Sequence, residues 1–347
     1  MNRLAGEFEN QRATVILFPF RTDVWRDNCA PIRQFMVDLA NKIAEFQPVV
    51  FGVLPKLVDF VKENYKLNKN VKIIPLLYND CWARDTVSSI VVGEEKYIAS
   101  FKFNAYGAGL YTPWDDDERI DLTMAKEFNY KIKDCPVTLE GGNIAPDGKG
   151  TLFCIKDSIV NANRNPQFSI DEVEKLLKEA TASKQIVWIP QGLVEDETGG
   201  HIDNVLAFVD SNTIIHSWTD EKTHPQYQRV REIEELLKKT KNAEGKEYSL
   251  VRLPLPPMYY RTKEDAMDIE EKEDSFARVG GEPVLETYTN FALINGAVIV
   301  PQFGIELDKE ALSIIQKAYP DRKVIPFYAR EATLGGGGLH CLTKHIN

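Results

Sequence analysis

Short apolar runs of the kind that form β-strands recur along the whole chain and alternate with helical patterns. Ten runs rich in branched and aromatic residues are bounded by turn residues: ATVILFPF, VVFGVL, VKIIPL, SSIVV, TLFCI, QIVWIP, VLAFV, TIIHSW, FALI and AVIVP. The helical spacing of apolar residues predicts helices over 31–46, 122–132, 171–182, 227–241 and 309–319. Because strands outnumber helices about two to one, the pattern favours an α/β fold made of units of two or three strands and one helix.

No Gly/Ser-rich linker divides the chain, so we expect a single α/β domain over residues 1–347. The stretch 262–282, TKEDAMDIEEKEDSFARVGGE, is dense in charged residues. Such a composition predicts a surface loop or an insertion.

The formal net charge of −10 restricts the class of partner. Nucleic acids and anionic membranes bind basic patches, so we expect neither as a partner. A small cationic ligand suits this charge better, although an acidic surface also serves solubility alone.

The cellular compartment is predicted from the cysteines and the N-terminus. Five cysteines are scattered without pairing motifs, and the first 20 residues lack the apolar core of a secretory signal. No apolar run approaches the ~18 residues of a membrane-spanning helix. We therefore expect a cytoplasmic protein without disulfides.

Cys341 follows four glycines near the end of the sequence, in GGGGLHCLTKHIN. Glycines let the backbone approach a ligand closely, and a thiol with a base in reach is a nucleophile. Two other interpretations stay open at this point. The run could be a flexible tail with an incidental thiol, or Cys341 could bind a metal with His340 and His345, although the other cysteines supply no second ligand pair.

A second cluster is EDETGGHIDNVLAFV, in which one residue separates His201 from Asp203. If this segment is extended, both side chains lie on the same face of a strand. A histidine and a carboxylate in one pocket form a general acid/base beside an anionic anchor. The alternative at this point is that His201 is an ordinary surface histidine whose hydrogen bonds are satisfied.

Two further carboxylates stand at predicted strand ends. Trp82 and Asp85 lie in NDCWARDT, and Glu140 precedes two glycines in LEGGNIAPDGKGT. Loops at strand ends often carry functional residues, although each acid alone could equally be a turn or capping residue.

Together these clusters predict a thiol surrounded by more acids than a cysteine protease needs. Anions beside a thiolate raise its pKa, which is unfavourable unless the substrate is a cation. A guanidinium group is planar, permanently charged and matched by carboxylates through paired hydrogen bonds. The residues therefore point to attack of a thiol on a guanidinium carbon.

The chain resembles the agmatine deiminases of the guanidino-group-modifying superfamily. The matching segments follow the family's order over essentially the whole chain: GEFENQRATVILFPFRTDVWRDN, NDCWARDT, FKFNAYGAGLYTPWDDD, LEGGNIAPDGKGT, NRNPQ, EDETGGHIDNVLAFV, TYTNFALINGAVIVPQFG and GGGGLHCLTK. The resemblance implies the pentein fold, an α/β propeller of five ββαβ-type modules around a central active-site channel. It also implies a homodimer or a larger homo-oligomer.

The resemblance also implies roles for individual residues. Cys341 is expected to be the nucleophile and His201 the general acid/base. Asp85 and Asp203 are expected to bind the guanidinium nitrogens, and Glu140 to contact the guanidinium or orient His201.

Further positions follow from the same motifs. Trp82 is expected to form a wall of the site, and Glu197 to lie near the amine end of the substrate. Cys81 then becomes a neighbour of the site instead of a rival nucleophile. No metal or organic cofactor is expected.

The implied activity is hydrolysis of agmatine, through an amidino-cysteine intermediate, to N-carbamoylputrescine and ammonia in putrescine and polyamine biosynthesis. Deimination of free or peptidyl arginine is the nearest alternative, and the acids at 115–117 and 195–197 favour agmatine because its far end is an ammonium. An inactive guanidinium-binding module and an unrelated thiol hydrolase acting on a neutral amide are the alternatives from other classes. The sequence departs from the family at WARDTVSS, where Gly-Pro is usual after the acid, and at the acidic residues 265–274.

Overall fold

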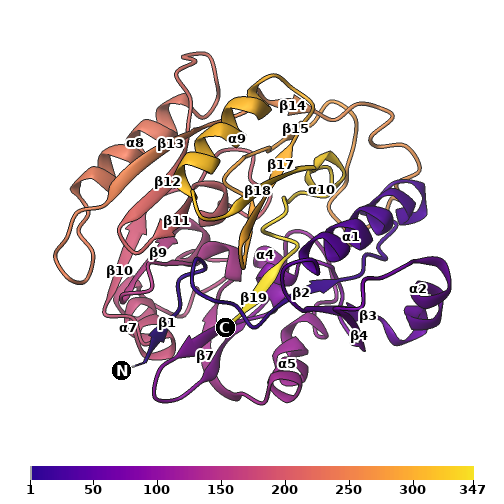
Figure 1. Cartoon of the computed structure of the whole chain (residues 1–347), viewed down its shortest axis with the longest axis horizontal. Helices are drawn as coiled ribbons and strands as arrows, with labels where there is room; N and C mark the ends of the chain where they lie inside the picture. Colours follow the sequence, from indigo (N-terminus) through magenta and orange to yellow (C-terminus); the bar gives the residue numbers. More distant parts are fainter. Residues whose placement is uncertain (1) are drawn as a thin grey trace.

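The strands form where the sequence carries its apolar runs. The computed structural model describes residues 2–347 and has an α/β fold (Figure 1). β2 (Ala13–Leu17) and β9 (Thr151–Ile155), for example, are buried at every position, as expected for strands covered on both faces. All ten predicted strands are present.

In the described part of the chain, the strands form five sheets of three or four strands and one sheet of two. The first two sheets are β19 (Lys344–Ile346), β2, β3 (Val49–Val53), β4 (Val71–Pro75) and β1 (Arg3–Leu4), β5 (Ser89–Val92), β6 (Tyr97–Lys102), β7 (Lys131–Thr138). The next two are β10 (Gln185–Ile189), β9, β8 (Ala145–Pro146) and β11 (Leu206–Asp210), β12 (Thr213–Trp218), β13 (Ser249–Pro254). The last two are β16 (Ala292–Ile294), β17 (Ala297–Gln302), β18 (Lys323–Tyr328) and the pair β14 (Tyr259–Tyr260), β15 (Pro283–Val284).

Five longer helices lie toward the outside of the strands: α1 (Ala30–Ile43), α5 (Ile120–Phe128), α7 (Ile170–Thr181), α8 (Tyr227–Lys239) and α9 (Leu307–Ala318) (Figure 1). The shorter α-helices are α2 (Val58–Asn64), α3 (Ala83–Thr86), α4 (Ala105–Ala108), α6 (Lys156–Ile159) and α10 (Arg330–Thr333). The 3₁₀ turns are η1 (Asp27–Cys29), η2 (Pro55–Leu57), η3 (Asp117–Arg119), η4 (Gly141–Asn143) and η5 (Ile202–Asn204). None of the helices described for residues 2–347 has the length and hydropathy needed to cross a bilayer.

The five larger sheets share one local pattern. In each, one strand pairs antiparallel with one neighbour and parallel with the other, as β17 does with β16 and β18. A helix connects the parallel pair in every case, for example α1 between β2 and β3 and α9 between β17 and β18. This is the crossover that parallel strands require.

The helix predictions are confirmed for α1, α7, α8 and α9 within a few residues at each end. The prediction over 122–132 is wrong at its C-terminal end, because α5 stops at Phe128 and Asn129 takes a left-handed conformation (φ 58°). A left-handed residue ends a helix, and the following residues join β7 beside β6.

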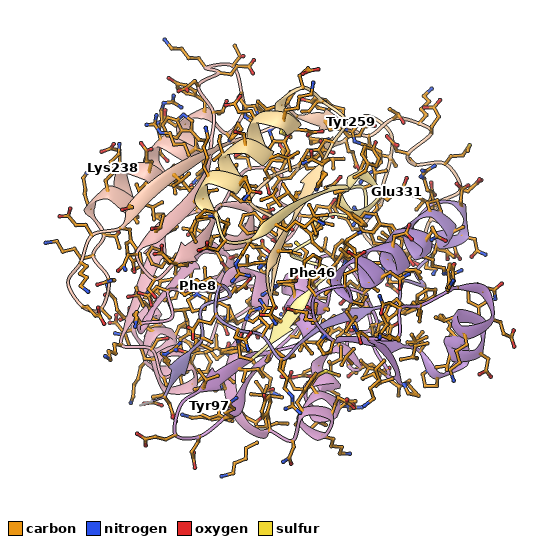
Figure 2. All side chains as sticks on the ribbon, viewed as in Figure 1. Phe8, Phe46, Tyr97, Lys238, Tyr259 and Glu331 are labelled. Atoms are coloured by element: carbon orange, nitrogen blue, oxygen red, sulfur yellow. The ribbon has the colours of Figure 1, made fainter. Side chains whose placement is uncertain are left out.

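Side chains fill the space between the sheets and the helices (Figure 2), and apolar side chains from several sheets form the largest buried cluster. The largest apolar cluster of the described residues packs α1 and the sheet around β2 against β17 and α9. Lys238 of α8 lies at the outer rim, as its partly exposed ammonium requires (Figure 2). Smaller apolar clusters lie around β9 and α7 and around β11 and α8, so the core is divided among several groups of side chains.

The prediction of a surface loop over 262–282 is confirmed. The described residues between β14 and β15 form turns and irregular backbone without a helix or a strand, and most of them are exposed. Arg278 is an exception because it is only 8% exposed and points back toward the protein.

Candidate active site

The glycine run and Cys341 are buried inside the protein, so the flexible-tail interpretation is wrong. Seven consecutive residues from 341 to 347 are buried, and β19 pairs antiparallel with β2. At Gly337 an added Cβ would lie 2.7 Å from the Trp82 ring and 2.9 Å from the Cys341 Cβ. A side chain at this position would therefore displace either the thiol or the indole.

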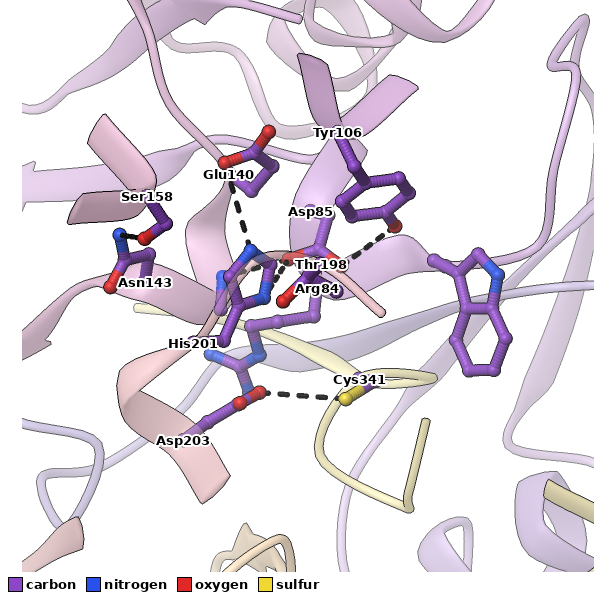
Figure 3. Close-up of polar contacts among 12 residues, drawn as sticks. Arg84, Asp85, Tyr106, Glu140, Asn143, Ser158, Thr198, His201, Asp203 and Cys341 are labelled. Atoms are coloured by element: carbon purple, nitrogen blue, oxygen red, sulfur yellow. Dashed lines mark hydrogen bonds and ion pairs between the residues drawn. The ribbon is translucent and has the colours of Figure 1, made fainter. Parts of the chain in front are cut away.

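The five residues expected to carry the chemistry come together in one buried region (Figure 3): Asp85, Glu140, His201, Asp203 and Cys341. The Cys341 Sγ lies 3.5 Å from Asp203 Oδ2. His201 lies between two carboxylates, with Nδ1 3.7 Å from Asp85 Oδ1 and Nε2 3.6 Å from Glu140 Oε2.

Gly142 shows how closely these groups converge. A Cβ there would stand 2.6 Å from His201 Nδ1, 2.8 Å from Asp85 Oδ1 and 3.1 Å from Asp203 Oδ2. Three functional side chains thus surround a single backbone position, and its N–H donates to Asp85 Oδ1 at 2.8 Å. Only glycine leaves room for this arrangement.

Short turns after strands position the acids. Asp85 lies in α3, Glu140 immediately precedes η4, and Asp203 lies in η5 just before β11. The expectation that His201 and Asp203 share a face of an extended strand is wrong, because Ile202–Asn204 forms a 3₁₀ turn. The turn nevertheless directs both side chains into the same region.

Several polar atoms of this site are buried without a hydrogen-bond partner among the described residues. They are both ring nitrogens of His201, Glu140 Oε2 and Asp203 Oδ1. Buried polar atoms are nearly always paired in native proteins, so unmatched ones need an explanation. Here carboxylate acceptors are available to a ligand with several N–H groups.

The protonation states follow from burial and from the neighbouring charges. Burial disfavours a charged imidazole, but Asp85 and Glu140 outweigh this effect and raise the pKa of His201 to about 9. Burial raises the pKa of Asp85 to about 6 although His201 opposes it. Burial, together with Asp203 and Asp85, holds the pKa of the Cys341 thiol well above its usual range. Without a ligand, the site therefore favours an imidazolium and a neutral thiol near pH 7.

Three residues of the site were not assigned a role from the sequence. Tyr106 donates its hydroxyl to Asp85 Oδ2 at 2.9 Å, and Asn290 donates Nδ2–H to Cys341 Sγ at 3.2 Å. Arg164 donates from Nε to Glu140 Oε1 at 2.8 Å, and against the effect of burial it helps to hold the pKa of Glu140 below its usual range. The only available signal was their position in the segments FKFNAYG, NRNPQ and TYTNFALI.

Trp82, which the family resemblance implies as a wall of the site, lies beside the thiol. Its buried ring packs 5.7 Å from that of Trp25 and borders Gly337 next to the thiol. The indole pair therefore closes one side of the site with apolar surface.

Glu197 borders the same glycine run but is already paired. A Cβ on Gly336 would lie 2.4 Å from Glu197 Oε2, and Arg278 donates to both oxygens of Glu197 at 2.7 and 2.8 Å. Asp117, one of the acids at 115–117, accepts hydrogen bonds from Tyr111 and from the backbone of Asn79. These acids are therefore not free anions facing the thiol.

Cys81 and the histidines near Cys341 have surroundings of their own, which bear on the rival nucleophile and on the metal interpretation. Burial holds the pKa of Cys81 well above its usual range, with Asp80 adding to the effect. His345 contacts Arg84 and Glu7 at 3.3 and 3.5 Å. Among residues 2–347, no group of three or more histidine, cysteine, aspartate or glutamate side chains is arranged to hold a metal ion.

Comparisons with known proteins match almost the whole chain. The model of the Porphyromonas-type peptidyl-arginine deiminase family matches residues 3–346. A Latilactobacillus sakei protein with the provisional name agmatine deiminase is 33% identical over 352 residues, covering 99% of this chain and 95% of that protein. A similarly named Shewanella baltica protein is 35% identical over 349 residues, covering 99% and 93%.

Solved structures of agmatine deiminases also match almost the whole chain. The agmatine deiminase of Enterococcus faecalis superposes with a TM-score of 0.95 at 28% identity, covering 99% of this chain and 95% of that one. A variant of the C. jejuni agmatine deiminase with substrate bound has a TM-score of 0.85 at 29% identity, covering 100% and 96%. The chain therefore belongs to the Porphyromonas-type peptidyl-arginine deiminase family.

Proposed function

We propose that this protein is a hydrolase that deiminates agmatine to N-carbamoylputrescine and ammonia. One observation carries the proposal: a buried thiol, an imidazole and three carboxylates converge, and several of their polar atoms have no partner within the described residues. A flat cation with several N–H donors satisfies these acceptors and offsets their charge. The relatives of this protein and its structural neighbours are named as agmatine deiminases.

The free atoms suggest how the guanidinium is held. Asp203 Oδ1 has no partner among the described residues and can accept one N–H. Each Asp85 oxygen accepts one hydrogen bond, from Gly142 or from Tyr106, and keeps a second lone pair for another nitrogen. Glu140 remains fixed by Arg164 and presents its free Oε2 to His201 and the substrate. Two aspartates thus orient the guanidinium carbon toward the thiol.

In the first half-reaction, Cys341 sulfur as thiolate forms a bond to the guanidinium carbon. The bond from that carbon to one terminal nitrogen then breaks, and its electron pair stays on the nitrogen. His201, which is protonated near pH 7, donates a proton to this nitrogen, and ammonia leaves. An amidino-cysteine remains.

In the second half-reaction, water attacks the same carbon and gives a proton to His201. The carbon–sulfur bond breaks with its electron pair on sulfur, which restores the thiolate. The remaining hydroxyl proton passes to bulk water, and the neutral ureido product leaves. Two steps with moderate barriers replace one difficult displacement on a resonance-stabilised carbon.

Binding of the cation also activates the nucleophile. Burial and the neighbouring aspartates disfavour the thiolate when the site is empty. A bound guanidinium places positive charge beside the sulfur and lowers the pKa of the thiol. The substrate therefore creates part of the environment that its own reaction needs.

Agmatine is preferred to arginine because the far end of agmatine is an ammonium. The carboxylate of arginine would lie near the carboxylate of Glu197 and be repelled by it. The ammonium of agmatine can instead share the Glu197 carboxylate with Arg278. The names of the relatives also support agmatine as the substrate, although the family model is named after deiminases of peptidyl-arginine.

We also propose that the five sheets form the five modules of a pentein propeller in one domain over residues 1–347. Their common strand pattern supports this arrangement. The protein is further proposed to be a cytoplasmic homo-oligomer that needs no cofactor.

The test compares purified protein with agmatine, free arginine and an arginyl peptide, measuring the ureido product and ammonia. Agmatine should give both products, and the Cys341→Ala variant should bind agmatine without turnover. Preferential turnover of arginine or the peptide would reassign the substrate. Binding without product by the unaltered protein would favour a guanidinium-binding module.

A further inference from the structure

His340 precedes the nucleophile, but its imidazole lies between two carboxylates. Nδ1 lies 2.9 Å from Asp203 Oδ2, and Nε2 lies 3.0 and 3.1 Å from the two oxygens of Glu7. The ring therefore joins an acid of the proposed guanidinium site to an acid near the N-terminus. His340 is buried, and among the described residues neither it nor its two carboxylate partners belong to a group that could hold a metal ion.

We propose that His340, fixed by Glu7, is a positioning residue that orients Asp203 and sets the reactivity of the Cys341 thiol. The inference rests on the proposed function of the site. It adds two residues, Glu7 and His340, that act through Asp203 and do not touch the substrate.

The two Asp203 oxygens have different partners. Oδ2 accepts from His340 and lies 3.5 Å from the thiol, whereas Oδ1 has no partner among the described residues. The hydrogen bond from His340 thus fixes the rotation of the carboxylate and leaves Oδ1 for the substrate. Without that donor, the buried carboxylate can turn toward other donors.

The charge of the His340 ring follows from its two carboxylate partners. An ionised carboxylate only accepts hydrogen bonds, so an imidazole held between two of them donates from both nitrogens. His340 is then an imidazolium. In agreement, although burial and Arg84 oppose them, Glu7 and Asp203 raise the pKa of His340.

This positive charge lies beside the oxygen that faces the thiol. It offsets the charge of Asp203 and lowers the free-energy cost of forming the thiolate next to it. His340 is thus a built-in cation that acts before the substrate arrives.

The remaining charged groups around His340 define the environment of the pair. Arg84 of α3 contacts Glu7 at 2.5 Å, and His345 of β19 lies 3.5 Å from the same carboxylate. Burial opposes ionisation of Glu7, but Arg84 and the two histidines outweigh it and hold the pKa of Glu7 well below its usual range. Glu7 therefore stays ionised and keeps His340 charged.

The backbone at this position is anchored separately from the ring. The His340 N–H donates to Asn290 Oδ1 at 3.0 Å, and Arg84 donates to the His340 carbonyl. A small cavity of about 30 Å³, large enough for water, also reaches Glu7, Asp203 and His340. The ring can therefore be replaced while the loop that carries Cys341 keeps its anchors.

The experiment measures alkylation of Cys341 by iodoacetamide in the full-length protein as a function of pH, with Cys341→Ala as the background. The variants are His340→Ala, His340→Asn and Glu7→Gln. Asn can place a donor near the position of Nδ1 but carries no charge, and Gln keeps an acceptor for Nε2. The matched control is His224→Asn, a buried histidine that contacts the Pro256 carbonyl elsewhere.

Both His340 variants should move the alkylation midpoint to higher pH and slow alkylation at pH 8 by about tenfold, because a charge is lost. Glu7→Gln should produce a smaller shift in the same direction. His340→Ala should also raise KM for agmatine by about tenfold, whereas His340→Asn should stay within about threefold of the unaltered protein. His224→Asn should match the unaltered protein.

Unchanged alkylation profiles in His340→Asn and Glu7→Gln would overturn the inference. If His340→Ala does not fold, these two conservative variants still decide it. Alkylation does not require turnover, so a shifted profile in a protein that fails to hydrolyse agmatine would reject the proposed function and keep the role of His340.

Discussion

Asp85 is the acid of the site that gains a proton most easily as the pH falls. Burial raises its pKa to about 6, whereas for Asp203 the opposing effect of His340 outweighs burial and holds the pKa below its usual value. As pH falls through 6, Asp85 gains a proton and loses its attraction for a guanidinium, whereas Asp203 stays ionised. We predict that agmatine binding to the Cys341→Ala variant weakens up to tenfold per pH unit below 6.

Calorimetric titration between pH 5 and pH 8 measures this effect without turnover. Agmatine keeps both positive charges over this range, so a change in affinity reports on the protein. A dissociation constant that stays level from pH 7 to pH 5 would mean that Asp85 does not bind the guanidinium.

Tyr106 supports the same carboxylate. Its hydroxyl donates to Asp85 at 2.9 Å, and its ring centroid lies 5.9 Å from that of His201. A hydrogen bond to a charged group contributes about 1.5–3 kcal/mol. Tyr106→Phe should therefore lower kcat/KM for agmatine by at least about tenfold.

Tyr111→Phe is the matched control, because Tyr111 donates to Asp117 outside the site. It should lower Tm and leave kcat/KM within about twofold. Equal losses of activity in the two variants would assign the effect of Tyr106 to folding.

The sequence was sufficient to predict the roles of some site residues but not of others. Cys341, Asp85 and Asp203 could be assigned because their chemistry is rare and their motifs match a family. Tyr106 and Asn290 could not, because their roles depend on single hydrogen bonds between segments far apart in the chain. A tyrosine or an asparagine has many ordinary positions in a protein, and the sequence alone does not reveal its partner.

At the scale of elements, the turn of η4 brings a backbone into contact with three functional side chains. An added Cβ at Gly142 would lie within 3 Å of both His201 and Asp85. Gly142→Ala should therefore displace these groups and lower kcat/KM by about a hundredfold, since small misplacements of reacting groups are costly. Steady-state kinetics together with Tm would separate this effect from unfolding.

Gly109→Ala provides the control. A Cβ there would meet only the Tyr106 carbonyl at 3.6 Å, an ordinary contact, and the backbone has a negative φ of −100°. Activity should be retained. Full activity in Gly142→Ala would show that the site can widen without loss of geometry.

Two of the strands that the sequence patterns missed, β7 and β18, share a physical cause. β7 and β18 alternate charged and apolar residues irregularly and are only partly buried. Their pairing with β6 and β17 stabilises them more than their own composition does. Tertiary pairing also explains why the residues after Asn129 form a strand although helical spacing continues there.

At the scale of the whole molecule, the same local unit recurs in five sheets, but no sequence repeat reveals it. Each unit buries its own set of apolar residues against different neighbours, so only the pattern of strand directions is shared. The family resemblance predicted five modules around a central channel, whereas strand and helix counting predicted only an α/β fold made of units of two or three strands and one helix.

The net charge of the molecule affects the rate at which a cationic substrate reaches the site. A chain with a formal charge of −10 attracts a cationic substrate over a distance that salt shortens, from about 10 Å at 0.1 M to about 3 Å at 1 M. Raising salt over this range should lower kcat/KM for agmatine by about three- to tenfold. Alkylation of Cys341 by iodoacetamide, a neutral reagent, serves as the control and should change less than twofold. If both rates fell equally, salt would be acting on the site or the fold, and long-range attraction of the substrate would be rejected.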